Sequence, residues 1–307
     1  MQARFLVGPT AAGKSAVAHR IALENGFDIL SADSMQVYRG LDIGTAKPTR
    51  AERREVRYAG LDLVGPKAAF SVARYREEAL AALQAAALAG RRVIVTGGSG
   101  LYIKSLTDGL APSTPPDGRM RRRWERLLAD GGVAALRQAL HERDPGRLAQ
   151  LPDSRNPRRL IRALERAESG ERGDAGRWVN NARMTGLHMP FSRLDLRIAE
   201  RARRMFDTGL IDEVRALLKG GLLPGTTAGQ AIGYAEAAAY LAGTCTLAES
   251  VDRTIARTRR LARRQMTWFR HQAAVRWVEV EEGMRIGAIA AAVTETWRRD
   301  GPTQIKE

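Results

Sequence analysis

Glycine, lysine and hydroxyl residues near the start of the chain have the spacing of a phosphate-binding loop. Residues 8–15 match the pattern G-x-x-x-x-G-K-[ST] at every required position. Glycines let such a loop turn tightly, so that successive backbone N–H groups point at one polyanion. Lys14 supplies a cation, and the Ser15 hydroxyl suits a magnesium ion that bridges phosphate oxygens. The residues predicted to bind the phosphate group are Gly8, Pro9, Thr10, Ala11, Ala12, Gly13, Lys14 and Ser15. The pattern does not indicate which phosphate compound the loop binds.

A carboxylate is predicted beside this loop. Residues 4–7 and 27–32 have the apolar character of buried strands, and residues 16–23 form a helix between them that Gly26 can end. In an open parallel sheet, ligands bind beyond the carboxyl ends of the strands, so Asp33 is expected to face the same crevice. The residues alone leave three roles open for it: a magnesium ligand, a proton acceptor, or the N-cap of a helix.

Strand and helix signals alternate over the first third of the chain. Ser71 is the predicted N-cap of a helix over residues 72–89, and residues 92–96 form another buried strand. That strand runs into a glycine-rich turn at residues 97–102, again at a strand end. The alternation predicts an α/β fold with a parallel sheet covered by helices on both faces. Residues 38–49 have no clear period and are predicted to be a functional loop.

The sequence changes character near residue 112. Residues 112–116 are rich in proline and are predicted to be a linker, after which arginine-rich helical segments replace the strands. The expected helices cover residues 119–130, 132–143 and 156–168, with Pro157 as the first helical residue of the third. Alternation at residues 194–198 predicts a returning strand. We therefore expect a core domain of residues 1–111 and 193–307, and an all-helical insertion of residues 112–192.

Two groups of arginines are candidates for binding a polyanion. Arg158, Arg159 and Arg162 crowd the start of the third insertion helix, where a bound anion would relieve their repulsion with the helix dipole. The second group lies on one stripe of a later helix: Arg253, Arg257, Arg260 and Arg264. The face opposite is apolar: Ile255, Ala262, Met266 and Phe269. The two groups predict nucleic-acid binding, with solvated surface as the alternative.

The composition narrows the class of protein. The chain has 307 residues, a hydrophobic fraction of 44% and a net charge of +16, which points to a polyanionic partner. One cysteine, Cys245, excludes an internal disulfide and a cysteine-built zinc site. No apolar run approaches the length of a membrane helix, and a strand begins so near Met1 that we expect no leader peptide. We expect a cytoplasmic monomer without membrane contact.

The same residues suit a reaction in which diphosphate is the leaving group. Hydrolysis of ATP would need a residue that positions water, and no sequence motif indicates one. A kinase that acts on a small molecule would not need an arginine-rich helix for its substrate. The loop amides, Lys14 and the Thr10 hydroxyl would instead stabilise charge on departing oxygens, while Asp33 takes a proton from an attacking nitrogen or oxygen.

Six segments together resemble one family. The first is residues 8–15, which many families share, and the second is the far more specific run Ser31-Ala32-Asp33-Ser34-Met35-Gln36-Val37-Tyr38-Arg39-Gly40-Leu41-Asp42-Ile43-Gly44-Thr45-Ala46-Lys47-Pro48. The others are Gly97-Gly98-Ser99-Gly100-Leu101-Tyr102, Arg162-Ala163-Leu164-Glu165, Gln230-Ala231-Ile232-Gly233-Tyr234 and Arg263-Arg264-Gln265-Met266-Thr267-Trp268. In this order, over nearly the whole chain, they resemble the bacterial tRNA dimethylallyltransferases, also called tRNA isopentenyltransferases.

The resemblance implies a fold and a reaction. The fold is a P-loop NTPase-like parallel sheet flanked by helices, with an inserted all-helical tRNA-binding domain. The reaction transfers a dimethylallyl group from dimethylallyl diphosphate to N6 of adenosine 37, beside the tRNA anticodon, with magnesium and release of diphosphate. It makes Asp33 the general base, and it places Thr10 at the bridging oxygen of the diphosphate.

The resemblance also implies a set of tRNA contacts: Asp33, Ser34, Met35, Gln36, Ser99, Arg123, Arg158, Arg159, Leu160, Ile161, Arg162, Gln230, Ala231, Ile232, Gly233, Tyr234, Arg257, Arg260, Arg263, Arg264 and Gln265. The chain departs from the family at residues 154–156 and at residues 58–61, and no role is transferred to the latter. Two other functions stay open: prenylation of a free adenine nucleotide, and an RNA-binding ATPase or kinase.

Overall fold

The computed structural model describes residues 1–110, 118–151, 153–170 and 182–306, which form two compact units. Unit 1 comprises Met1–Gly109 and Trp178–Glu307, and unit 2 is Leu110–Arg177. The strands are β1 (Gln2–Val7), β2 (Phe27–Ser31), β3 (Tyr58–Ala59), β4 (Arg92–Gly97), β5 (Arg183–His188), β6 (Ala274–Glu279) and β7 (Thr303–Gln304). The helices of unit 1 are α1 (Lys14–Asn25), α2 (Glu52–Glu55), α3 (Val72–Leu88), α4 (Gly100–Thr107), α8 (Phe191–Asp207), α9 (Leu210–Lys219), α10 (Tyr234–Leu241), α11 (Leu247–Gln272) and α12 (Ile286–Asp300).

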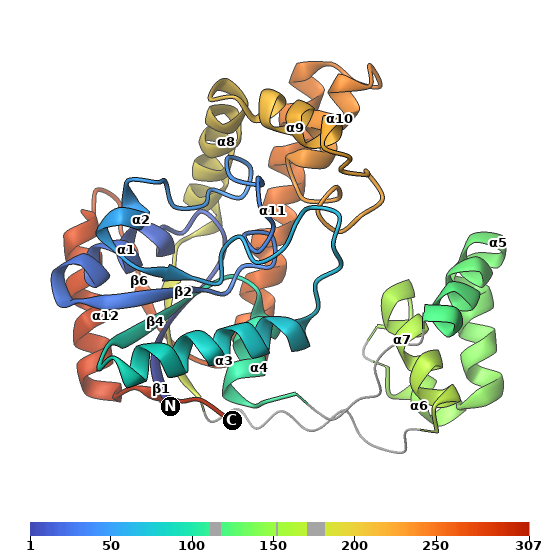
Figure 1. Cartoon of the computed structure of the whole chain (residues 1–307), viewed down its shortest axis with the longest axis horizontal. Coiled ribbons are helices and arrows are strands. Elements are labelled where there is room, and N and C mark those ends of the chain that lie inside the picture. Colours follow the sequence, from blue (N-terminus) through green and yellow to red (C-terminus); the bar gives the residue numbers. More distant parts are fainter. Residues whose placement is uncertain (111–117, 152, 171–181, 307) are drawn as a thin grey trace. The chain divides into compact units, whose positions relative to one another are not determined.

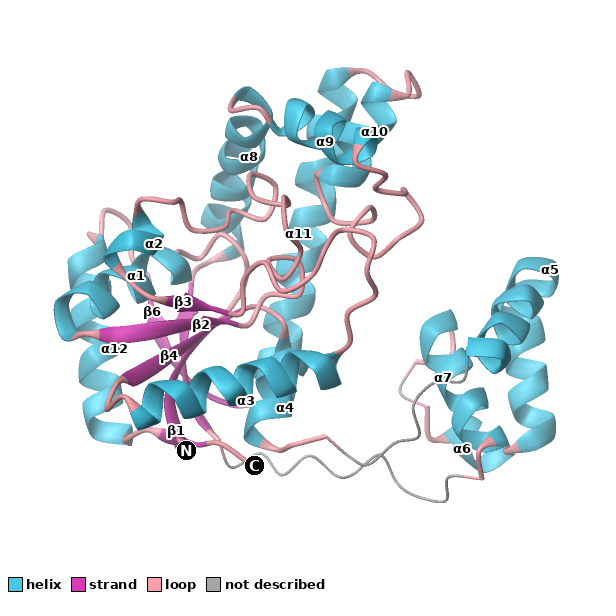
Figure 2. Ribbon diagram, viewed as in Figure 1, coloured by secondary structure: helices cyan, strands magenta, loops and turns pink. Residues whose placement is uncertain are grey.

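A mostly parallel sheet forms the centre of unit 1 (Figure 2). Its strand order is β3-β2-β4-β1-β5-β6, with every pair along this path parallel. The short β7 pairs antiparallel with the start of β1, so the described ends of the chain lie side by side (Figure 1). Because all path strands run one way, the ends of β1, β2 and β4 meet at one edge, where sequence reasoning places the phosphate loop and Asp33.

Helices cover both faces of the sheet, as the alternating pattern predicts. On one face, α3 and α4 pack through Leu83 and Ile103 against Val95. On the other face, α1, α8 and α12 pack against the sheet in a second apolar cluster that includes Val17 and Ile198. The parallel sheet between two helical layers confirms the predicted α/β class.

Unit 2 is all helical in its described residues and has an apolar core of its own. It consists of α5 (Gly118–Arg143), α6 (Pro145–Ala149) and α7 (Pro157–Glu168). Gly132 has a φ of 64°, which breaks α5 where sequence reasoning separates two helices. Trp124, Leu136, Leu140, Leu160 and Leu164 are buried in its core. Pro157 is the first residue of α7, as predicted, and the Asn156 side chain caps the helix.

The structure corrects two expectations at the end of the insertion. The core resumes at β5, before residue 193, because Arg183–His188 is a strand of the main sheet. The strand expected at residues 194–198 is wrong, since these residues belong to α8. Leu194, Ile198 and Ala202 are buried, so the apolar pattern follows the helical spacing of four residues. The linker expected at residues 112–116 lies outside the described residues.

No helix in the described ranges combines the length and the apolar character needed to cross a membrane.

Candidate active site

The predicted phosphate loop connects the end of β1 with the start of α1. Gly8 has a φ of 132°, and a Cβ atom there would lie 2.8 Å from the carbonyl oxygen of Leu187 on β5. Gly13, which precedes the first helical residue Lys14, has a φ of 98°. Both positions therefore need glycine, because side chains rarely adopt these conformations. The loop turns as its sequence pattern predicts.

A cavity of about 540 Å³ lies beside this loop. It brings together residues from both predicted catalytic segments: Thr10, Lys14 and Ser15 of the loop and Asp33 at the end of β2. The turn after β4 and the loop before α2 contribute further walls, through Gly97, Gly98, Thr45, Ala46, Lys47 and Pro48. The shared cavity confirms the expectation that the loop and Asp33 face one crevice.

Three arginines of α8 also line the cavity: Arg197, Arg201 and Arg204. Arg201 donates to the Thr10 hydroxyl at 3.2 Å, and Arg197 donates to the Ala11 carbonyl at 3.0 Å. Sequence reasoning missed them, because it assigned part of this segment to a strand. The available signal was helical spacing, since residues 197, 201 and 204 lie on one side of a helix. Lys14, Arg197 and Arg201 bring positive charge to the cavity beside the loop, whereas Arg204 is paired at 2.5 Å with Glu200, which also lines the cavity.

Lys14 is buried, with its ammonium group inside the loop. Its Nζ donates to the Pro9 carbonyl at 2.7 Å. Burial lowers the pKa of Lys14 to about 8 and the nearby Arg201 adds to the lowering, while the negative charge of Asp33 opposes it. Burial also lowers the pKa of Arg201, against the opposing effect of Asp33. A polyanion in the loop would supply the countercharge that both cations need.

Asp33 is held by a turn of its own backbone. Its Oδ1 accepts a hydrogen bond from the Met35 N–H at 2.8 Å, and the Ser34 N–H donates to the Ser99 hydroxyl at 2.9 Å. Within the described residues, Oδ2 of Asp33 accepts no hydrogen bond, although the side chain lines the cavity. The carboxylate is thus oriented by one oxygen while the other remains able to take a proton.

Gln265 of α11 connects the two glycine-rich segments. Its Oε1 accepts from the Thr10 N–H at 2.8 Å, and its Nε2 donates to the Gly98 carbonyl at 3.1 Å. The approach is close, because a Cβ atom on Gly98 would lie 2.2 Å from Gln265 Nε2, and one on Gly97 would lie 2.2 Å from the carbonyl oxygen of Ala32. Gln265, which the resemblance assigns to tRNA, therefore also holds the cavity together.

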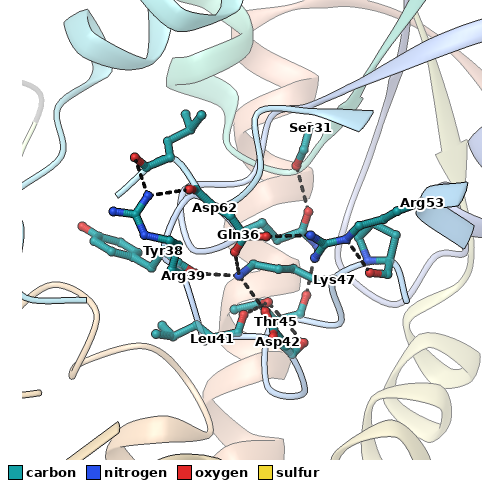
Figure 3. A network of polar contacts seen from close by, with 12 residues as sticks. Ser31, Gln36, Tyr38, Arg39, Leu41, Asp42, Thr45, Lys47, Arg53 and Asp62 are labelled. Carbon is teal, nitrogen blue, oxygen red and sulfur yellow. Dashed lines mark hydrogen bonds and ion pairs between the residues drawn. The ribbon is translucent and has the colours of Figure 1, made fainter. Parts of the chain in front are cut away.

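Residues 41–48, which we call the wall loop, line the cavity through Thr45 to Pro48. Buried Lys47 donates to the Tyr38 carbonyl at 2.6 Å, to Asp42 at 2.8 Å and to Asp62 at 2.7 Å (Figure 3). Gln36 accepts from Ser31 at 2.8 Å and donates to the Thr45 carbonyl at 3.1 Å. These bonds hold the wall loop in one conformation from the interior of the protein. The function expected of residues 38–49 stays a prediction.

The Gln230–Tyr234 motif divides into an exposed and a buried part. Gln230 is exposed and Ile232 is half-buried, whereas Ala231, Gly233 and Tyr234 are buried. Tyr234 is only 1% exposed, and its hydroxyl lies against Glu213 of α9. Their assignment to tRNA stays a prediction, and the burial of Tyr234 gives its side chain a role inside the protein.

The arginine stripe of α11 is less uniform than its sequence indicates. The apolar residues predicted opposite it are all buried, which confirms the orientation of the helix. Arg257, however, is paired with buried Glu236 of α10, and it also donates to the Gln230 carbonyl at 2.9 Å. Arg260 and Arg264 are exposed and have no ion pair among the described residues. Arg253 lies 4.0 Å from Glu249, so two of the four arginines of the stripe have carboxylate partners.

Arg263 lies at the edge of the same helix and has partners in α8. It pairs with Asp195 at 2.9 Å and stacks over the Phe191 ring. Its assignment to tRNA stays a prediction.

In unit 2, the predicted tRNA residues lie on exposed and buried faces. Arg158 and Arg159 are exposed, whereas Leu160 and Ile161 are buried in the core of the unit. Arg162 pairs with Glu165 at 3.0 Å. The Asn156 side chain accepts from the backbone N–H groups of residues 158 and 159, at 3.1 and 3.4 Å, so the start of α7 is already capped.

Arg123 of α5 pairs with Glu168 of α7 at 3.1 Å, and its guanidinium lies over the ring of Trp124. The tRNA contacts expected of the residues in unit 2 stay predictions.

Comparisons of the sequence and of the structure with known proteins identify the family of this chain. A family model described as IPP transferase matches residues 36–272. The chain is 43% identical to a tRNA dimethylallyltransferase of Geobacter sulfurreducens, over 90% of this chain and 91% of that one. It is 40% identical to one of Corynebacterium jeikeium, over 94% of each chain. A tRNA isopentenylpyrophosphate transferase structure from Bacillus halodurans, 34% identical, covers 97% of each chain with a TM-score of 0.69. The chain belongs to the IPP transferase family.

Proposed function

We propose that this protein transfers a dimethylallyl group from dimethylallyl diphosphate to N6 of adenosine 37 in tRNA. The observation that carries the proposal is the cavity that holds a phosphate loop and a carboxylate together, within a chain of the IPP transferase family. The relatives reported above are named as tRNA dimethylallyltransferases, and the predicted nucleic-acid surface fits a tRNA acceptor.

The residues that line the cavity have different roles in the reaction. N6 of the adenine forms a bond to C1 of the dimethylallyl group, while the bond from C1 to the diphosphate oxygen breaks. Asp33 takes the proton that N6 loses. Lys14 and Arg201 stabilise the negative charge that develops on the departing diphosphate. The Thr10 hydroxyl accepts from Arg201, so its own proton is directed away from that guanidinium and can be donated to the bridging oxygen.

Magnesium fits the oxygen donors that line the cavity. The Ser15 hydroxyl and the Asp33 carboxylate both line the cavity, and oxygen donors are those that magnesium prefers. The described residues contain no group of three histidine, cysteine, aspartate or glutamate side chains placed to hold a metal. We therefore propose that Ser15 and the substrate diphosphate hold the ion, which would neutralise charge on the leaving group.

The adenine has to leave its stack to reach this cavity. Extrusion costs less from a single-stranded anticodon loop than from a duplex. Asp33 is positioned for the exocyclic amine of an everted base because it lies at the strand ends, beyond the sheet.

Mass spectrometry of an anticodon arm tests the proposal. The purified protein, given magnesium and dimethylallyl diphosphate, should add one dimethylallyl unit to an arm that carries an adenosine at position 37. AMP and ATP in place of the arm are matched acceptors. Prenylation of AMP alone would support a free-nucleotide enzyme, and RNA-stimulated ATP turnover without transfer would support an ATPase. Either result would overturn the proposal.

A further inference from the structure

The wall loop is held from outside the cavity by two residues of neighbouring helices. Glu213 of α9 accepts hydrogen bonds from the backbone N–H groups of Asp42 and Ile43, at 3.1 and 3.0 Å. Tyr234, the first residue of α10, accepts from the Gly44 N–H at 3.1 Å and donates to Glu213. Three consecutive backbone groups of the wall loop are thus bound by one carboxylate and one hydroxyl.

The environment of Glu213 and Tyr234 favours their hydrogen bonds to the wall loop. Burial and the neighbouring carboxylate of Glu213 raise the pKa of the Tyr234 hydroxyl, so it keeps its proton and donates to the carboxylate. The ring of Tyr234 lies directly over Gly44, where a Cβ atom would come within 2.4 Å of the ring. Only glycine fits at residue 44 while this contact exists.

The same bonds connect the wall loop with the reacting groups. The next residues, Thr45 to Pro48, line the cavity together with Thr10 and Asp33. On the other side, the Gln230 carbonyl and Glu236 bind Arg257 of the arginine helix. Tyr234 lies between these partners in sequence, and its helix packs against both α9 and α11.

We propose that Glu213 and Tyr234 are positioning residues for the transfer reaction, which hold the wall loop at its working distance from the donor. This inference rests on the proposed function. It gives Tyr234 the role of supporting the wall loop from outside the cavity in place of tRNA contact, and it gives Glu213 a role that no sequence motif indicated. Displacing a substrate-positioning group by about 1 Å can cost as much as about a hundredfold in rate.

Steady-state kinetics on the full-length protein test the inference. Tyr234→Phe keeps the ring over Gly44 and removes the hydroxyl, and Glu213→Ala removes the carboxylate. Each should lower kcat/KM for dimethylallyl diphosphate by about ten- to a hundredfold, with the Kd for the anticodon arm unchanged within about twofold. Glu213→Gln keeps an acceptor oxygen and should restore most of the loss. Because the two residues form one network, the double variant should be no worse than Glu213→Ala alone.

Asp212→Ala is the matched control: it removes a carboxylate from the same helical turn, and among the described residues Asp212 pairs only with exposed Arg215. Its kinetics should equal those of the unmodified protein. Wild-type kinetics in both variants, with or without a lower Tm, would overturn the positioning role. A rise in Kd for the arm equal to the loss in kcat/KM would also overturn it, in favour of tRNA contact. Failure of the unmodified protein to transfer at all would instead overturn the proposed function.

Discussion

Asp33 is oriented through one carboxylate oxygen by the N–H of Met35, while the other lines the cavity unbonded within the described residues. This arrangement separates chemistry from binding. Asp33→Ala should abolish transfer and leave the Kd for the anticodon arm within a few-fold, because the Ser34 N–H can still donate to the Ser99 hydroxyl after the bond to the Met35 N–H is lost. Single-turnover transfer and filter binding measure the two effects. A large loss of binding with transfer intact would contradict the role of proton acceptor.

Lys14 gives the site a pH dependence whose sign follows from its environment. Burial lowers its pKa to about 8 in the free protein, and a bound polyanion would raise that pKa. Above pH 8, binding of diphosphate must therefore take up a proton, and affinity should fall by up to about tenfold per pH unit. Calorimetry in buffers of different ionisation enthalpy measures the uptake. Lys14→Met should bind more weakly without proton uptake; equal uptake in this variant would assign the proton to another group.

At the scale of elements, α11 combines a structural face with a solvent-exposed cationic one. Arg260 and Arg264 are exposed and without ion pairs in the described part of the chain, so replacing both by alanine should weaken tRNA binding. The salt dependence of binding should become shallower by about one to two in log-log slope. Titration of the anticodon arm at several salt concentrations measures it. An unchanged slope would make these arginines ordinary solvated surface.

Arg257 should behave differently from its neighbours on the stripe. Its partner Glu236 is buried and also accepts from the Gly233 N–H at 2.8 Å. Arg257→Ala leaves that carboxylate without its cation, so the protein should lose about 1–3 kcal/mol of stability. Chemical denaturation measures the loss, with Arg260→Ala as the matched control. Equal stability of the two variants would contradict a structural role for Arg257.

The wall loop adds an acid-sensitive contribution to stability. Burial alone would raise the pKa of Asp62, but hydrogen bonds from Lys47 and Arg53 outweigh burial and lower it. Because the folded pKa lies below the unfolded one, this stability is present above about pH 4 and is lost as the pH falls through the folded value. Asp62→Asn should therefore lose less stability than the unmodified protein in acid, whereas exposed Asp212→Asn should not differ. Parallel acid curves for Asp62→Asn would contradict the ion pair.

At the scale of the whole molecule, unit 2 has its own apolar core. We therefore expect unit 2 to unfold with a free energy of its own, independent of unit 1. Leu164 is fully buried in that core. Leu164→Ala should destabilise unit 2 by about 2–5 kcal/mol and lower transfer to tRNA, while diphosphate binding by unit 1 stays unchanged. Tryptophan fluorescence during denaturation, with diphosphate calorimetry, checks both. Loss of diphosphate binding would show that the two units fold as one.

Sequence reasoning predicted the parts of the site that local rules determine. The phosphate loop, Asp33, the cap at Ser71 and the helix start at Pro157 depend on short-range spacing, so the printed residues suffice for them. The strand expected at residues 194–198 failed because short apolar runs fit both periods. That error separated Arg197 from Arg201, although both lie on one helix, α8, and line the cavity together. Glu213 was beyond reach, because its contact with the wall loop joins segments distant in sequence.

The division of the chain into units determines which unit is complete first during synthesis. Unit 2 is continuous, whereas unit 1 is assembled from two segments on either side of it. The N-terminal segment contains the phosphate loop, but β5, whose Leu187 carbonyl lies against Gly8, is translated after the helical unit. On the ribosome, the helical unit can therefore fold before the cradle is complete. A nascent chain halted after the helical unit should resist protease there, yet retain no dimethylallyl diphosphate.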